Sequence, residues 1–67
     1  MTVYAKDLLL RMVSEIENGH QNSFDDMELM VASKFLYELE NLGFVKVTVG
    51  VFTTVSVLPE GFKMAKK

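Results

Sequence analysis

Four ionisable side chains near the middle of the chain are the first candidates for chemistry. His20, the only histidine, is followed by Asp25, Asp26 and Glu28. Closely spaced carboxylates are candidate ligands for Ca²⁺ or Mg²⁺. Histidine is the side chain that most often transfers protons in catalysis near neutral pH. A metal site or an acid–base site would therefore be sought here first.

The spacing favours neither site. The three carboxylates fall in the first turn of an expected helix, where negative charge meets the positive end of the helix dipole. The central glycine and distal glutamate of a Ca²⁺ loop are missing. The chain has no cysteine and no second histidine to share a metal with His20. The sequence therefore predicts no metal and no cofactor.

Nucleophilic catalysis is not predicted either. The serines stand without a base nearby in sequence, no nucleophile-elbow motif surrounds any of them, and no glycine-rich phosphate loop is present. We therefore expect no catalytic residue, no enzyme activity and no small-molecule substrate.

The composition predicts a single small domain, residues 1–67. A chain of this length buries only about 60% of its unfolded surface, yet 49% of its residues are hydrophobic. We therefore expect a homodimer or a protein partner, although a small domain also shows apolar atoms at its surface. The net charge of −2 provides no broad basic face for nucleic acid. Because neither a membrane span nor a signal peptide is visible, a cytoplasmic location is expected.

Residues 3–18 show the periodicity of an amphipathic helix, with Thr2 as the expected N-cap and Gly19 as the expected C-terminal cap. Its predicted core face consists of Ala5, Leu8, Leu9, Met12, Val13 and Ile16. Val3 and Leu10 point away from that face. They are candidates for a second contact surface.

Residues 24–42 are also predicted to be helical, with Ser23 as N-cap and Asp26 completing a capping box. The expected apolar stripe consists of Phe24, Met27, Val31, Phe35, Leu39 and Leu42. No glycine or proline interrupts it. The segment is therefore either one long helix or two short helices broken near Ala32–Ser33.

A β-hairpin is predicted after Gly43, which is expected to end the helix in the left-handed conformation. Valines alternate with polar residues on both strands. A three-residue loop, 50–52, would place Val47 opposite Val55 and gather the valines on one face. Residues 59–61 are then expected to turn the chain, with Phe62 and Met64 packing back and Lys66–Lys67 frayed.

Two segments carry a family resemblance. "FLYELENLGFVKV" resembles the end of a winged-helix recognition helix entering its first wing strand, and "VSVLPEGFKMAKK" resembles the segment after the wing. Together they cover about the last half of the chain. The sequence most resembles small uncharacterised winged-helix proteins of Gram-positive bacteria and their phages. It departs from the family in a helix-turn-helix region compressed to residues 23–43 and in a hairpin tip without cations.

The resemblance implies an α+β winged-helix-like domain: an N-terminal helix, one long or two short helices, and a hairpin wing. It further implies a small transcriptional regulator that binds duplex DNA. The candidate DNA-binding residues are Ser33, Lys34, Tyr37, Asn41 and Lys46. Glu38 and Glu40 flank them and would repel phosphates. The alternative interpretation of this face is an ordinary solvated surface, or a dimer surface that uses Met30 and Tyr37.

The apolar hairpin tip favours a second hypothesis. Val49, Val51 and Phe52 are costly to leave bare if they are contiguous, and an edge strand can pair with another chain. Together with Leu10, these residues are the candidate protein interface. The alternative function is thus a protein–protein interaction module, such as a phage or mobile-element accessory protein, that uses the fold without binding DNA.

Overall fold

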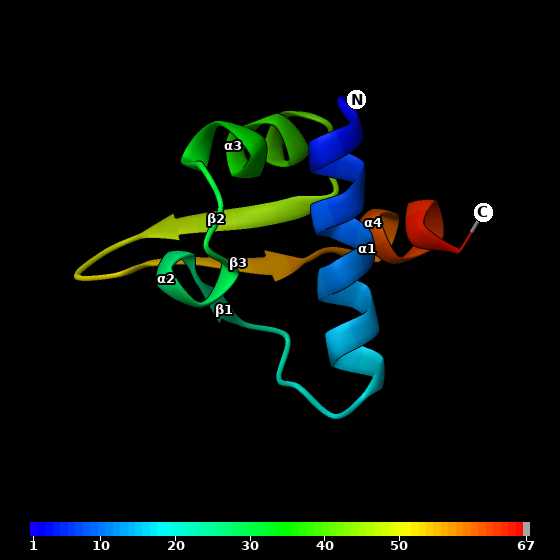
Figure 1. Cartoon of the computed structure of the whole chain (residues 1–67), viewed down its shortest axis with the longest axis horizontal. Coiled ribbons are helices and arrows are strands. Elements are labelled where there is room, and N and C mark those ends of the chain that lie inside the picture. Colours follow the sequence, from blue (N-terminus) through cyan, green and yellow to red (C-terminus); the bar gives the residue numbers. More distant parts are fainter. Residues whose placement is uncertain (67) are drawn as a thin grey trace.

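The computed structural model describes residues 1–66, which form a small α+β domain with four helices and a three-stranded antiparallel sheet (Figure 1). The elements in chain order are α1 (Val3–Glu17), β1 (Phe24–Asp25), α2 (Asp26–Leu29), α3 (Ser33–Asn41), β2 (Val45–Val49), β3 (Thr53–Val57) and α4 (Pro59–Ala65).

The first helix is confirmed, although it ends one residue earlier than predicted, at Glu17, with Asn18 as its C-cap. The Thr2 side chain accepts a hydrogen bond from the backbone N–H of Ala5, and Gly19 follows the helix with a φ of 104°. The predicted core face is buried except at its last residue, Ile16, which is half-buried. Val3 and Leu10 are exposed, as expected.

The hairpin register is also confirmed. Val49 lies opposite Thr53, Val47 opposite Val55 and Val45 opposite Val57, with residues 50–52 as the loop. Along β2 the core-facing valines become progressively more exposed, from buried Val45 through half-buried Val47 to Val49. The hairpin therefore extends beyond the helices that cover its base, and its tip projects from the body of the domain (Figure 1).

The prediction for residues 24–42 was partly wrong. Phe24 and Asp25 form strand β1, which pairs with β3, because Phe24 fills the core opposite Val55. The helix that follows is capped by Asp25, not by Ser23. The Asp25 carboxylate accepts from the Glu28 N–H at 2.6 Å, while Glu28 accepts from the Asp25 N–H in a complete capping box.

The sequence left open whether this segment is one long helix or two short helices, and the structure contains two short helices. Helix α2 ends at Leu29, Met30 adopts the left-handed conformation with a φ of 52°, and α3 begins at Ser33. The expected apolar stripe is only partly buried: Phe24 and Leu39 lie in the core, and Val31 and Phe35 pack against it. Met27 is 75% exposed and Leu42 46% exposed, whereas Leu36 and Leu39 are buried.

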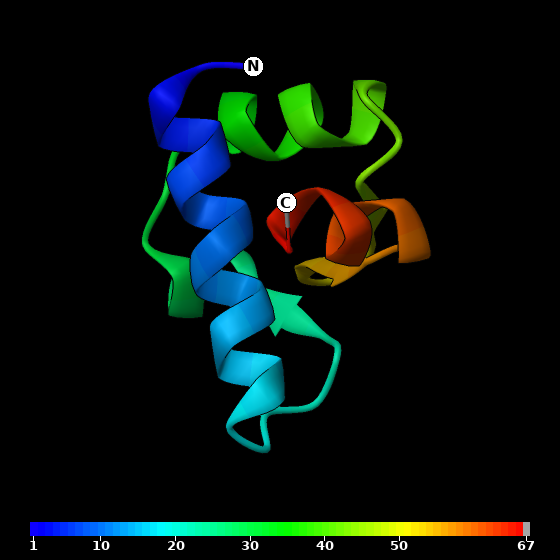
Figure 2. The same ribbon diagram turned by 90° about the vertical axis from the view of Figure 1, so that its right-hand side faces the viewer.

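The core lies between the sheet and the helices. Helices α1 and α3 meet near the N-terminus, and α4 lies beside α1 (Figure 2). The junction of α1 and α3 is fixed by Glu38, whose carboxylate accepts from the backbone N–H and the hydroxyl of Thr2, at 2.6 and 3.1 Å. The largest fully buried side chains are Phe24, Leu9, Met12, Leu36, Leu39, Val45 and Val55.

Residues 59–61 form the first turn of α4 and not an isolated turn, with Pro59 in the first turn, where its missing N–H costs nothing. Phe62 and Met64 pack against the core as predicted. Lys66, which was expected to fray, lies just beyond the end of α4, with its ammonium 3.6 Å from the exposed Glu17 carboxylate. Lys67 lies outside the described residues.

Candidate functional site

The predicted recognition residues of α3 share its outer face. Ser33, Lys34, Tyr37 and Asn41 are all exposed, while Leu36 and Leu39 turn inward. The Lys34 ammonium lies 5.2 Å from the centre of the Phe35 ring. This face therefore offers one cation, an aromatic hydroxyl and two short polar side chains.

The two glutamates expected to flank this face are held by hydrogen bonds. Glu38 is bound to Thr2, as described above, and the Glu40 carboxylate accepts from the backbone N–H of Val47 at 2.9 Å. Both carboxylates are thus drawn from α3 toward neighbouring elements. The hydrogen bond with Glu40 also uses the N–H of Val47, which lies in the middle of the edge strand β2 and points away from the sheet.

Lys46 comes from a different element. It is exposed on β2, where it lies opposite Ser56. Because side chains alternate along a strand, Lys46 points to the sheet face opposite the one on which Val45 packs into the core. The predicted DNA-binding set is therefore divided between the α3 face and the polar face of the sheet.

The apolar hairpin tip is largely exposed to solvent. Val51 is 96% exposed, Val49 69% and Phe52 65%. Leu10, which was grouped with them as an interface candidate, lies in α1 far from the tip (Figure 1). The structure therefore separates Leu10 from the other three residues.

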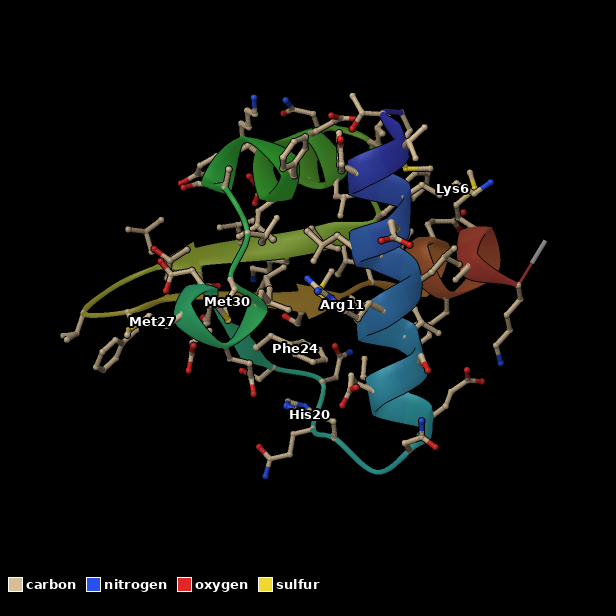
Figure 3. All side chains as sticks on the ribbon, in the orientation of Figure 1. Lys6, Arg11, His20, Phe24, Met27 and Met30 are labelled. Carbon is tan, nitrogen blue, oxygen red and sulfur yellow. The ribbon has the colours of Figure 1, made fainter. Side chains whose placement is uncertain are left out.

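Two methionines from the α2 region add to this end of the molecule: Met30, which the sequence already placed on an outer face, and Met27, which it wrongly placed in the core stripe. Met27 is 75% exposed and Met30 89% exposed, and both lie on the side toward which the hairpin projects (Figure 3). The register places Asp25 opposite Thr54. Strand β1 ends there and α2 begins at the next residue, so Met27 leaves the sheet beside β3, on the helix that contacts this strand.

We call these five residues the hairpin-end surface: Met27, Met30, Val49, Val51 and Phe52. Soluble monomers rarely expose contiguous apolar patches larger than a few hundred Å². Met27 lies in α2 and Met30 caps the C-terminus of that helix, whereas the sequence placed both in the predicted helical segment 24–42.

A second cluster surrounds His20, which stacks on Phe24 with ring centres 4.2 Å apart. Its Nδ1 lies 2.6 Å from the Gln21 carbonyl oxygen and its Nε2 3.0 Å from a Glu28 carboxylate oxygen. The Gln21 carbonyl and Glu28 both favour the protonated ring, so they raise the pKa of His20 above 6.5.

An open cavity of about 250 Å³ adjoins this histidine. Arg11, on its wall, donates to the Leu29 carbonyl oxygen at 3.0 Å. The cavity is lined by Arg11, Met12, Glu15, His20, Phe24, Glu28 and Leu29. None of these lining residues is a serine or threonine. The cluster ties the loop after α1 to α2.

Among residues 1–66, no group of three or more His, Asp or Glu side chains is arranged to hold a metal ion. Nor does any helix in that range have the length and apolar character required to cross a membrane. Comparison of the chain with family models, curated proteins and solved structures found no significant match.

Proposed function

We propose that the chain is a small protein–protein interaction module of winged-helix type, acting in the cytoplasm, whose docking site is the hairpin-end surface. One observation carries the proposal: five large apolar side chains at the projecting end keep about two thirds or more of their area exposed. Burial of apolar area is the main driving force for protein association.

The element order supports the winged-helix-type architecture. A short strand lies between the first two helices and pairs with the last strand, and two helices joined by a tight turn precede a β-hairpin. In the DNA-binding winged-helix proteins that the sequence resembles, the tip of this hairpin carries cations. Here its loop is Gly50-Val51-Phe52, which suits an apolar protein surface better than phosphate.

The conformation of Met30 supports the same conclusion. A non-glycine residue in the left-handed region costs roughly 1–2 kcal/mol, and turns between such helices often use glycine there. Met30 contributes almost nothing to the core in return, because 89% of its surface is exposed. A flexible, polarisable methionine at a contact surface accounts for this choice.

Duplex DNA binding by the α3 face is the second candidate. Its specific support is that hydrogen bonds hold Glu38 and Glu40, which leaves Ser33, Lys34 and Asn41 as a polar stripe. With Lys34 and Lys46 as the phosphate contacts, the slope of log K against log salt would be only about −2. A gel-shift titration at low salt that shows no duplex binding would remove this candidate.

The protein-interaction proposal is tested by a photo-crosslinking residue placed at Phe52, with the same residue at Val3 as control. Val3 is an apolar side chain on α1 that is 81% exposed, so it matches Phe52 in character but lies outside the hairpin-end surface. We expect a discrete protein adduct from position 52, in purified protein or in the cells that encode the chain. Adducts from neither position, or equal adducts from both, would refute the proposal.

A further inference from the structure

We infer that the partner docked by the hairpin-end surface is a second copy of this chain, in a twofold-symmetric dimer. This inference rests on the proposed function, because it names the occupant of the same surface. Three features support a second copy: the apolar area on offer, the placement of charges around it, and the blocked edge of β2.

The area is of the right order for a specific dimer. Specific interfaces bury roughly 800 Å² on each partner. Val51 and Met30 are almost fully exposed, and Met27, Val49 and Phe52 are about two thirds to three quarters exposed. These residues supply most of such an interface without any rearrangement of the core. In a twofold dimer the same surface serves both sides, so no other apolar surface is needed.

Charges of opposite sign lie on the two short helices that pack beside the hairpin strands. Lys34 is exposed in the first turn of α3, and Asp26, which is half-buried, lies in the first turn of α2. In a dimer whose twofold axis passes between these two residues, Lys34 of each chain faces Asp26 of its partner. The dimer therefore brings opposite charges together at the rim of the interface, where they set orientation more than affinity.

The free edge of β2 does not offer an alternative mode of pairing. Continuous edge-to-edge pairing would need the outward N–H of Val47, but this group already donates to the Glu40 carboxylate. A charged side chain that occupies an edge in this way opposes sheet extension. Association is thus directed to the side chains at the hairpin end.

The first test is sedimentation equilibrium of the purified protein at concentrations up to about 1 mM. We expect the mass to rise from 7.6 kDa toward twice that value. Phe52→Glu should weaken association roughly a hundredfold or more, because an aromatic anchor is lost and a charge is buried on both sides of the axis. Val3→Glu, the matched control, should leave the dissociation constant unchanged.

A charge-reversal experiment tests the twofold geometry. Lys34→Glu alone places acid against acid at the rim, and Asp26→Lys alone places base against base, so each variant should associate more weakly. An equimolar mixture of the two restores both attractive pairs only in the mixed dimer, which should form in preference to either homodimer. Circular dichroism would confirm that each variant keeps its fold.

A wild-type chain that stays monomeric at about 1 mM, or equal loss of association in Phe52→Glu and Val3→Glu, would overturn the inference. So would a mixture of the charge variants without preferential mixed pairing. These outcomes are separable from failure of the proposed function. A monomer that still gives a position-specific adduct in cells, at a mass other than that of the dimer, refutes the second copy but retains the docking surface.

Discussion

Replacing Asn22 by alanine removes two hydrogen bonds that join the 18–23 loop to β3. The Asn22 side chain accepts from the backbone N–H of Val57 at 2.7 Å and donates to the Val57 carbonyl oxygen at 2.8 Å. Val57 is only 3% exposed. The carboxamide thus takes the place of a β1 residue beyond Phe24 and completes the ladder on that side of β3.

The expected loss of stability follows from these contacts. Each hydrogen bond contributes about 1 kcal/mol net, and a buried N–H or C=O left unpaired costs about 1–3 kcal/mol. We expect Asn22→Ala to lower the free energy of unfolding by about 2–4 kcal/mol, out of about 3–10 kcal/mol for a domain of this size. The midpoint of urea unfolding should fall by about 1 M or more, with an unchanged slope.

Asn18→Ala is the matched control. Its side chain donates one hydrogen bond to the Ser14 carbonyl oxygen at 3.0 Å, but at an exposed site. Water can replace this bond, so the expected loss is below about 0.5 kcal/mol. If Asn22→Ala were no more destabilising than Asn18→Ala, the role of Asn22 in completing the sheet would be refuted.

Three further predictions concern stability. Met30→Gly should raise the free energy of unfolding by about 0.5–1 kcal/mol in urea titrations, because it relieves the left-handed conformation, yet it should weaken self-association. Gly61→Ala should destabilise the domain by about 1–3 kcal/mol in the same assay despite the better helix propensity of alanine, since its Cβ would clash with the Phe44 carbonyl oxygen. The Gln21 carbonyl and Glu28 raise the pKa of His20 in the folded state. The contribution of protonated His20 to the free energy of unfolding is therefore complete below pH 6.5 and is lost as the pH rises through the folded-state pKa. NMR titration should place this pKa above 6.5, and Glu28→Gln should lower it.

Local patterns were sufficient to predict the first helix and the hairpin. A helix of fifteen residues repeats its apolar spacing several times, and the valines of the hairpin fix a register that a one-residue slip would destroy. Gly43 was correctly expected to be left-handed, with a φ of 81°. In each case the residues that determine the structure lie close together in the sequence.

The errors arose where distant contacts decide the structure. Strand β1 has only two residues, and it exists because Phe24 and Asp25 pair with β3 some thirty residues later. Without that pairing, Phe24 and Met27 fit a helical stripe. The exposure of Met27 could not be predicted once this stripe was assumed, whereas Val49, Val51 and Phe52 were already predicted to form an interface.

The hydrogen bonds of Glu38 and Glu40 were invisible in the sequence for a similar reason. Their partners, Thr2 and Val47, belong to other elements. The sequence therefore predicted both glutamates to be exposed charges beside the α3 face. Only the packing of α1 and β2 against α3 shows that their carboxylates accept hydrogen bonds from backbone N–H groups.

The most direct test of the hairpin-end surface is a ¹H–¹⁵N NMR dilution series on the wild-type chain. On concentration toward about 1 mM, amide shifts should move for Met27, Met30 and residues 49–52, while those of α1 residues 3–10 stay constant. A spectrum that does not change with concentration, or changes confined to α1 or to the outer face of α3, would contradict docking of a second copy through this surface.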